Sequence, residues 1–125
     1  MGAAKVSKFT EVRIPEGATE VKGAIRVDGM DDVYILSFVT DEEKAVSISE
    51  DLNAEKPLRR VKKMASATGD FDQLGLADPD TLDNVRWTGV CPSCVRDKRR
   101  KGVLQIDIYV QPRPQGKARV YVRAL

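Results

Sequence analysis

The chain has 125 residues, of which 42% are hydrophobic and 32% are charged, with a net charge of +2 and no histidine. This balance fits a single β-rich domain over residues 1–125 and excludes wholesale disorder. No apolar run approaches the roughly 18 residues of a membrane span, and residues 1–7 lack a secretory signal, so we expect a cytoplasmic protein with no membrane partner. Without histidine, Ser-His-Asp and Cys-His nucleophile arrangements are excluded, and we expect a protein that is not an enzyme.

Charge is divided unevenly along the chain. Residues 1–57 hold 7 basic and 12 acidic residues, a net charge of −5, whereas residues 58–125 hold 14 basic and 7 acidic residues, a net charge of +7. This asymmetry predicts an acidic partner for the second half, or a contact between the acidic half of one copy and the basic half of another. The alternative is that both halves fold together and their charges mingle on one surface.

In the first half, apolar residues alternate with a period of two, which indicates β-strands. We expect strands over residues 9–14, 21–27, 33–39 and 45–49, with turns at 29–32 and 41–44. The strand over 33–39 is apolar on both faces, which predicts a central position covered on both sides.

The middle of the chain predicts one short helix followed by a long loop. Apolar residues fall on one helical stripe over 58–65, with Pro57 suited to the first helical position and Gly69 suited to the end. Residues 66–83 are rich in Asp, Gly and Ser, which predicts a loop whose segment 78–83 is a turn or a single helical turn.

The end of the chain predicts an antiparallel hairpin. Apolar and polar residues alternate over 103–111 and again over 117–124, and a turn at 112–116 joins them, so we expect one dry face and one wet face. A strand over 85–90 precedes the hairpin, and its Trp87 is expected in the core. The predicted fold is mainly β, an antiparallel barrel or sandwich of six to eight strands with one short helix.

The motif Cys91-Pro-Ser-Cys94 leaves three interpretations open. It is a plain turn whose thiols can pair under oxidation, or half of a zinc site, or a redox centre that cycles between dithiol and disulfide. The zinc site requires four ligands, so Cys91 and Cys94 would need a second chain to complete it. We therefore expect no cofactor, with zinc as the one alternative that this motif leaves open.

A dense cationic turn at residues 96–101 follows the cysteines, and its charge predicts contact with phosphate. A second basic cluster lies at 59–63, and the expected wet face of the hairpin adds cations around two tyrosines, whose rings can stack on unpaired bases. The candidate nucleic-acid-binding residues are Arg96, Lys98, Arg99, Arg100, Lys101, Tyr109, Lys117, Arg119, Tyr121 and Arg123. The alternative interpretation is a solvated turn that keeps the protein soluble.

The sequence favours a non-enzymatic binding module whose basic C-terminal half contacts nucleic acid, either RNA or single-stranded DNA. The alternative is a structural self-assembly subunit, a homo-oligomer of the small coat or scaffold kind, held together by contacts between acidic and basic halves. A redox protein built on Cys91 and Cys94 is the third hypothesis.

Overall fold

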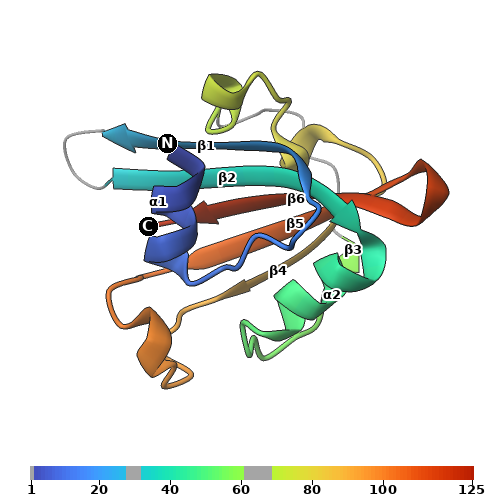
Figure 1. The fold of residues 1–125 in the computed structure, drawn as a ribbon. Helices are drawn as coiled ribbons and strands as arrows, with labels where there is room; N and C mark the ends of the chain where they lie inside the picture. Colours follow the sequence, from blue (N-terminus) through green and yellow to red (C-terminus); the bar gives the residue numbers. More distant parts are fainter. Residues whose placement is uncertain (1, 28–31, 61–68) are drawn as a thin grey trace.

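The computed structural model describes residues 2–27, 32–60 and 69–125. Within these residues, six antiparallel strands form one sheet in the order β1-β2-β6-β5-β4-β3. They are β1 (Thr19–Val27), β2 (Asp32–Asp41), β3 (Arg59–Arg60), β4 (Arg86–Val90), β5 (Ile106–Arg113) and β6 (Lys117–Ala124). The mainly β, antiparallel fold is confirmed, although in the described residues these strands make an open sheet and not a closed barrel (Figure 1).

Helices cover one face of this sheet. The α-helices α1 (Gly2–Thr10) and α2 (Glu42–Glu50) both lie in front of the strands in Figure 1. The described parts of the connecting segments contain four short 3₁₀ helices: η1 (Asp72–Leu74), η2 (Pro79–Thr81), η3 (Lys98–Arg100) and η4 (Pro114–Gly116). Within the described ranges, no helix has the length and apolar character needed to cross a membrane.

Strand β2 is buried on both faces, as its continuous apolar run predicted. Leu36 and Phe38 belong to the large core beneath α1 and α2, whereas Val33 and Ile35 belong to a second core on the opposite face. Successive side chains of a strand point to opposite faces, so one strand contributes to both cores. Residues 69–85, with η1 and η2, close the second core, and the helical turn expected within 78–83 is η2.

The C-terminal hairpin is confirmed, with β5 and β6 paired so that Tyr109 lies opposite Tyr121. Its expected wet face is wrong, because the two tyrosines are only 8% and 3% exposed. Phe71, in the segment that covers them, packs edge-on against Tyr121 with ring centroids 5.4 Å apart. Tyrosine counts as polar in an alternation pattern, yet its ring supplies a large apolar surface that a covering segment can bury.

Trp87 confirms the expectation that it joins the core. It is partly buried against the second core, and its indole Nε1 donates to Asp107 Oδ1 at 3.1 Å. The guanidinium of Arg59, on the neighbouring strand β3, lies 4.6 Å from the centre of its ring. The partly buried indole therefore has both a hydrogen-bond partner and a cation on its face.

Two of the expected strands are wrong, since residues 9–10 end α1 and residues 45–49 lie within α2. In α2 the buried residues are Ala45 and Ser49, four positions apart, so the burial is helical. The turn expected at 41–44 is instead the end of β2 and the first turn of α2. Two glutamates lie in that first turn, Glu42 and Glu43, where their negative charge is stabilised by the positive end of the helix dipole.

The helix expected over 58–65 is also wrong where it can be compared. Residues 59–60 form β3, which pairs with Trp87 and Arg86 of β4. The remaining residues 61–65 lie outside the described residues, as does most of the turn expected at 29–32. Pairing with a neighbouring strand is a tertiary contact, and it overrides the weak local helix preference.

Candidate functional site

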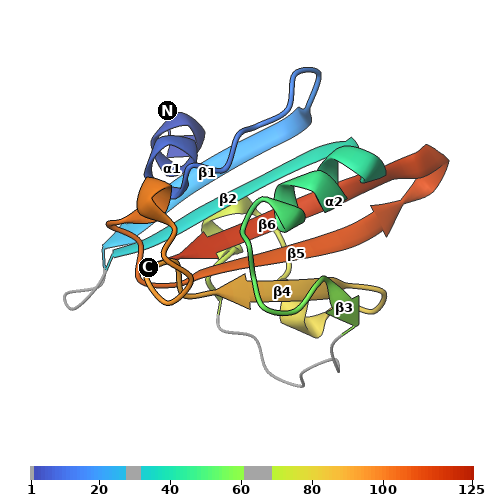
Figure 2. The same cartoon turned by 90° about the horizontal axis from the view of Figure 1, so that it is seen from below.

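The basic turn at 96–101 packs between the ends of α1 and α2. Asp97 precedes η3, and its carboxylate accepts a hydrogen bond from the backbone N–H of Arg99 at 3.1 Å. The turn leads the side chain of Arg100 inward, where only 1% of its surface is exposed. Figure 2 shows this turn, in orange, beside α1.

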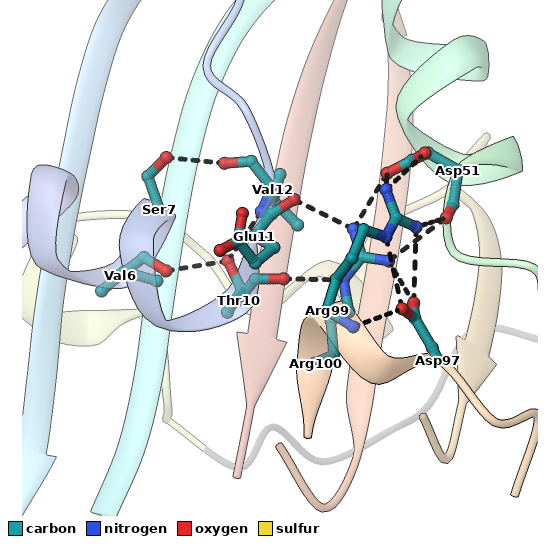
Figure 3. A network of polar contacts seen from close by, with 9 residues as sticks. All are labelled: Val6, Ser7, Thr10, Glu11, Val12, Asp51, Asp97, Arg99 and Arg100. Atoms are coloured by element: carbon teal, nitrogen blue, oxygen red, sulfur yellow. Dashed lines mark hydrogen bonds and ion pairs between the residues drawn. The ribbon is translucent and has the colours of Figure 1, made fainter. Parts of the chain in front are cut away.

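Arg100 joins three segments that are far apart in sequence (Figure 3). Its Nε donates to the carbonyl of Thr10 at 2.7 Å, and its Nη2 donates to the carbonyl of Glu11 at 3.0 Å. Its Nη1 donates to the Asp51 carbonyl at 3.2 Å and to Asp97 Oδ2 at 2.7 Å. Carbonyls at the ends of helices lack partners within the helix, so one guanidinium satisfies the ends of α1 and α2 together.

Arg99 completes a cluster that we call the arginine network: Arg99, Arg100, Asp51 and Asp97. Arg99 Nη1 lies 3.0 Å from both carboxylate oxygens of Asp51. Burial tends to raise the pKa of Asp51 and Asp97, but hydrogen bonds from the two arginines outweigh it and lower the pKa of both carboxyls. The two arginines and two ionised aspartates carry no net charge together. Arg99 and Arg100 therefore mainly stabilise the fold by joining distant segments.

The arginine network predicts that acid destabilises the protein. A carboxyl whose pKa is lowered by folding adds stability above its unfolded pKa, and this stability is lost as the pH falls through the folded pKa. We expect the free energy of unfolding to fall between about pH 5 and pH 2, and to fall less steeply in an Asp97→Asn variant. Urea unfolding across this range measures the slopes, with the exposed change Asp32→Asn as control. Equal slopes for Asp97→Asn and the parent protein would contradict this prediction.

Two further cations of the hairpin are paired inside the protein. Arg119 is 5% exposed, and its guanidinium lies 2.7 Å from Glu20 Oε1. Arg123 bonds to the buried carboxylate of Asp70, which also pairs with Arg26 at 2.6 Å. These arginines hold the sheet and the residue 69–85 segment together and do not form an open cationic surface.

The charges of the two halves therefore partly neutralise one another within one chain. Lys117 pairs with Asp41 at 2.6 Å, and both side chains are about half exposed. Like the pairs of Arg119 with Glu20 and of Arg99 with Asp51, this contact joins the acidic first half to the basic second half. The alternative of mingled charges thus describes these three pairs between the halves.

The two candidate tyrosines do not present free rings. Burial raises the pKa of Tyr109, and the negative charges of Asp80 and Asp107 raise it further. Burial also raises the pKa of Tyr121, whose hydroxyl donates to Gln111 Oε1 at 3.1 Å. Because both rings pack in the second core, they cannot stack on bases as the sequence predicted.

Three residues of the basic turn remain open to solvent. Arg96, Lys98 and Lys101 are exposed, and in the described part of the chain none of them forms an ion pair. Arg99 is exposed on one side while its guanidinium is held by the arginine network. The turn thus leaves three cations exposed to solvent, fewer than its sequence predicts.

The fold brings cations from the N-terminus to the same place. An open pocket of about 640 Å³ is lined by three cationic residues, Lys8 of α1, Arg13 and Arg99, and by the carboxylate residues Glu11 and Asp51. Lys5 lies one helical turn before Lys8, so the two neighbour each other on α1. We define the basic face as the exposed cations outside the arginine network: Lys5, Lys8, Arg13, Arg96, Lys98 and Lys101.

Sequence reasoning missed Lys5, Lys8 and Arg13. They belong to residues 1–57, whose net charge of −5 gives no indication of a local group of basic residues. A signal was present, since residues 2–13 hold three basic residues and one acidic residue, Glu11. Their approach to the basic turn depends on contacts such as the one between Arg100 and Thr10, which are 90 positions apart.

Cys91 and Cys94 form a disulfide, with Cα atoms 5.2 Å apart, in the turn between β4 and η3. The N–H of Cys94 donates to the carbonyl of Cys91 at 2.9 Å. Zinc binds thiolates, so the zinc half-site remains a prediction for the reduced pair. Within the described residues, no three Cys, Asp or Glu side chains come together in a way that could hold a metal ion.

Comparison with protein-family models, curated proteins and solved structures finds no match to this chain. A proposal for its function therefore depends on the charge, exposure and position of its own residues. The basic face and the disulfide are the two features that the arginine network and the two cores leave unexplained.

Proposed function

We propose that the protein is a non-enzymatic module that binds nucleic acid through phosphate contacts at the basic face, in the cytoplasm. The proposal is supported by six exposed cations that lie on α1, directly after it, and on the basic turn, without a carboxylate ion-pair partner in the described residues. They are Lys5, Lys8, Arg13, Arg96, Lys98 and Lys101. Exposed cations without ion-pair partners are free to replace the counterions of a phosphate backbone.

The chemistry of this face favours the backbone of nucleic acid over its bases. Phe9, the aromatic residue of α1, is stacked on Tyr34 with ring centroids 3.8 Å apart, so one face of its ring is already occupied. Tyr109 and Tyr121 are buried in the second core. Phosphate contacts position a protein on nucleic acid but carry no sequence information directly. We expect binding with little sequence preference, and at least as strong to a duplex as to a single strand.

Charge reversal on the basic face is expected to weaken binding. In a Lys8→Glu/Lys98→Glu variant, each lost phosphate contact reduces the slope of log affinity against log salt by about 0.9 on duplex DNA. Fluorescence anisotropy of a labelled duplex and a labelled RNA, titrated at several salt concentrations, measures affinity and slope together. Arg99 and Arg100 are left unchanged, because replacing them would disturb the arginine network.

The matched control is Lys44→Glu/Arg113→Glu, which changes the net charge by the same amount. Lys44 lies in α2, and Arg113 ends β5 at the opposite end of that strand from the basic turn. The proposal requires the control to bind nearly as well as the parent protein. Equal weakening by both pairs would show that only net charge matters, and no weakening by the basic-face pair would exclude this face.

Self-assembly is the second candidate, because a surface of opposite charge lies on α2. An open pocket of about 690 Å³ is lined by Asp41, Glu42, Glu43 and Glu50 around Val46. The basic face of one copy can dock on this acidic surface of the next. Light scattering at rising salt concentrations tests this directly. Glu43→Lys/Glu50→Lys should abolish assembly, whereas binding to nucleic acid should persist in that variant.

A further inference from the structure

The two sulfurs of the Cys91–Cys94 disulfide have different surroundings. Cys94 is exposed to solvent, whereas Cys91 directly follows β4 and is half-buried. Ser93 Oγ lies 3.4 Å from Cys91 Sγ, and because a disulfide sulfur carries no hydrogen, the serine hydroxyl is the donor. A thiolate at Cys91 would accept this hydrogen bond more strongly, since the acceptor would then carry charge. Attack is thus easier at Cys94, and Cys91 is the better leaving group.

A pocket whose lining has an excess of positive charge includes both cysteines. Its volume is about 370 Å³, and its lining includes Lys56, Arg59 and Glu55 beside the two cysteines. This volume is in the range of pockets for small molecules. The guanidinium of Arg59 is held over the ring of Trp87, and the carbonyl of Lys56 accepts from the hydroxyl of Thr88 at 2.7 Å, so β4 positions both residues. Cations beside a sulfur favour its thiolate form.

We propose that Cys91–Cys94 is a thiol–disulfide exchange site for a small anionic thiol of the glutathione class. The thiolate attacks Cys94, and Lys56 and Arg59 attract the carboxylates of the incoming molecule. This activity does not depend on nucleic-acid binding, because the cations of this pocket are not members of the basic face. Compared with the redox interpretation of the motif, the proposal also names the sulfur that is attacked and the class of substrate.

Two molecules of the thiol reduce the disulfide. The first thiolate attacks Cys94 Sγ, the bond between Cys91 and Cys94 breaks, and its electron pair leaves on Cys91, which takes a proton from solvent. A second thiolate attacks the substrate sulfur of the mixed disulfide, and Cys94 leaves as a thiolate, which also takes a proton from solvent. The products are the protein dithiol and one oxidised molecule of the small thiol, so two electrons pass to the protein.

The first test is the kinetics of reduction of the folded protein by glutathione and by the uncharged thiol 2-mercaptoethanol, compared at equal thiolate concentration. We expect glutathione to reduce the disulfide faster than 2-mercaptoethanol does. In Lys56→Gln the ratio of the two rates should fall about two- to fivefold, because one exposed ion pair contributes a free energy of that size. Ser93→Ala should slow reduction by both thiols, whereas Ser47→Ala, an exposed serine of α2, should not. Circular dichroism confirms that each variant is folded.

The second test locates the first bond on the unaltered protein. Reaction with glutathione is quenched with acid at early times, and peptide mapping identifies the cysteine that carries glutathione. Glutathione on Cys94 supports the proposal. Three results would overturn the proposal. The first is glutathione on Cys91, and the second is the same ratio of the two reduction rates in Lys56→Gln as in the parent protein. The third is a disulfide that neither thiol reduces until the protein unfolds.

Discussion

An Arg100→Ala variant is expected to lose about 3–5 kcal/mol of unfolding free energy, the usual effect of removing one partner from a buried ion pair. The change would leave the carboxylate of Asp97 buried without the guanidinium 2.7 Å away. It would also remove the donors to the carbonyls of Thr10 and Glu11, and so detach the end of α1 from the turn. A loss of this size is a large part of the total stability of a small domain.

Urea unfolding at neutral pH measures the effect of the Arg100 variant. The matched control is Lys98→Ala, two positions earlier in the same turn, which is exposed and should change stability by less than about 0.5 kcal/mol. Arg100→Lys should also destabilise, because an ammonium group cannot reproduce the planar arrangement of donors. Similar stabilities for Arg100→Ala and Lys98→Ala would show that the arginine network does not hold the fold together.

Val120→Asp is expected to prevent stable folding. Val120 is fully buried in the centre of β6, where it lies opposite Phe38 of β2 and Val110 of β5. The substitution removes an apolar contact and places a charge in the large core beneath α1 and α2, where it has no partner. Ile106→Asp, also fully buried in that core, should have a similar effect.

Thermal unfolding followed by circular dichroism tests both aspartate variants. We expect no cooperative transition for either of them. The matched control is Leu104→Asp, because Leu104 is 65% exposed and lies two positions before Ile106. A cooperative transition near that of the parent protein in both core variants would mean that the hairpin is not part of the folded core. Unfolding of the control would show that this region tolerates no aspartate at all.

Several strands of the sheet could be predicted from sequence, because the alternation of apolar and polar residues in a strand is a local pattern. The alternation over 103–111 and 117–124 predicted β5 and β6, and the short turn between them sets their register. The continuous apolar run of 33–39 predicted a strand covered on both faces, and β2 contributes to two cores. Local patterns failed at α2, where Val46 and Ile48 suggest alternation although the buried residues are Ala45 and Ser49.

The sequence by itself determined the kind of fold and the presence of many cations near the C-terminus, since both follow from residue types and their spacing. Only the tertiary structure decided which cations are free. Arg100 is buried because carbonyls and carboxylates near residues 10, 51 and 97 surround it, while Lys98 beside it remains exposed. Tyr121 is buried because the segment containing Phe71 covers it. A charge or ring binds a partner only if the fold leaves it unsatisfied, and that depends on contacts between residues distant in sequence.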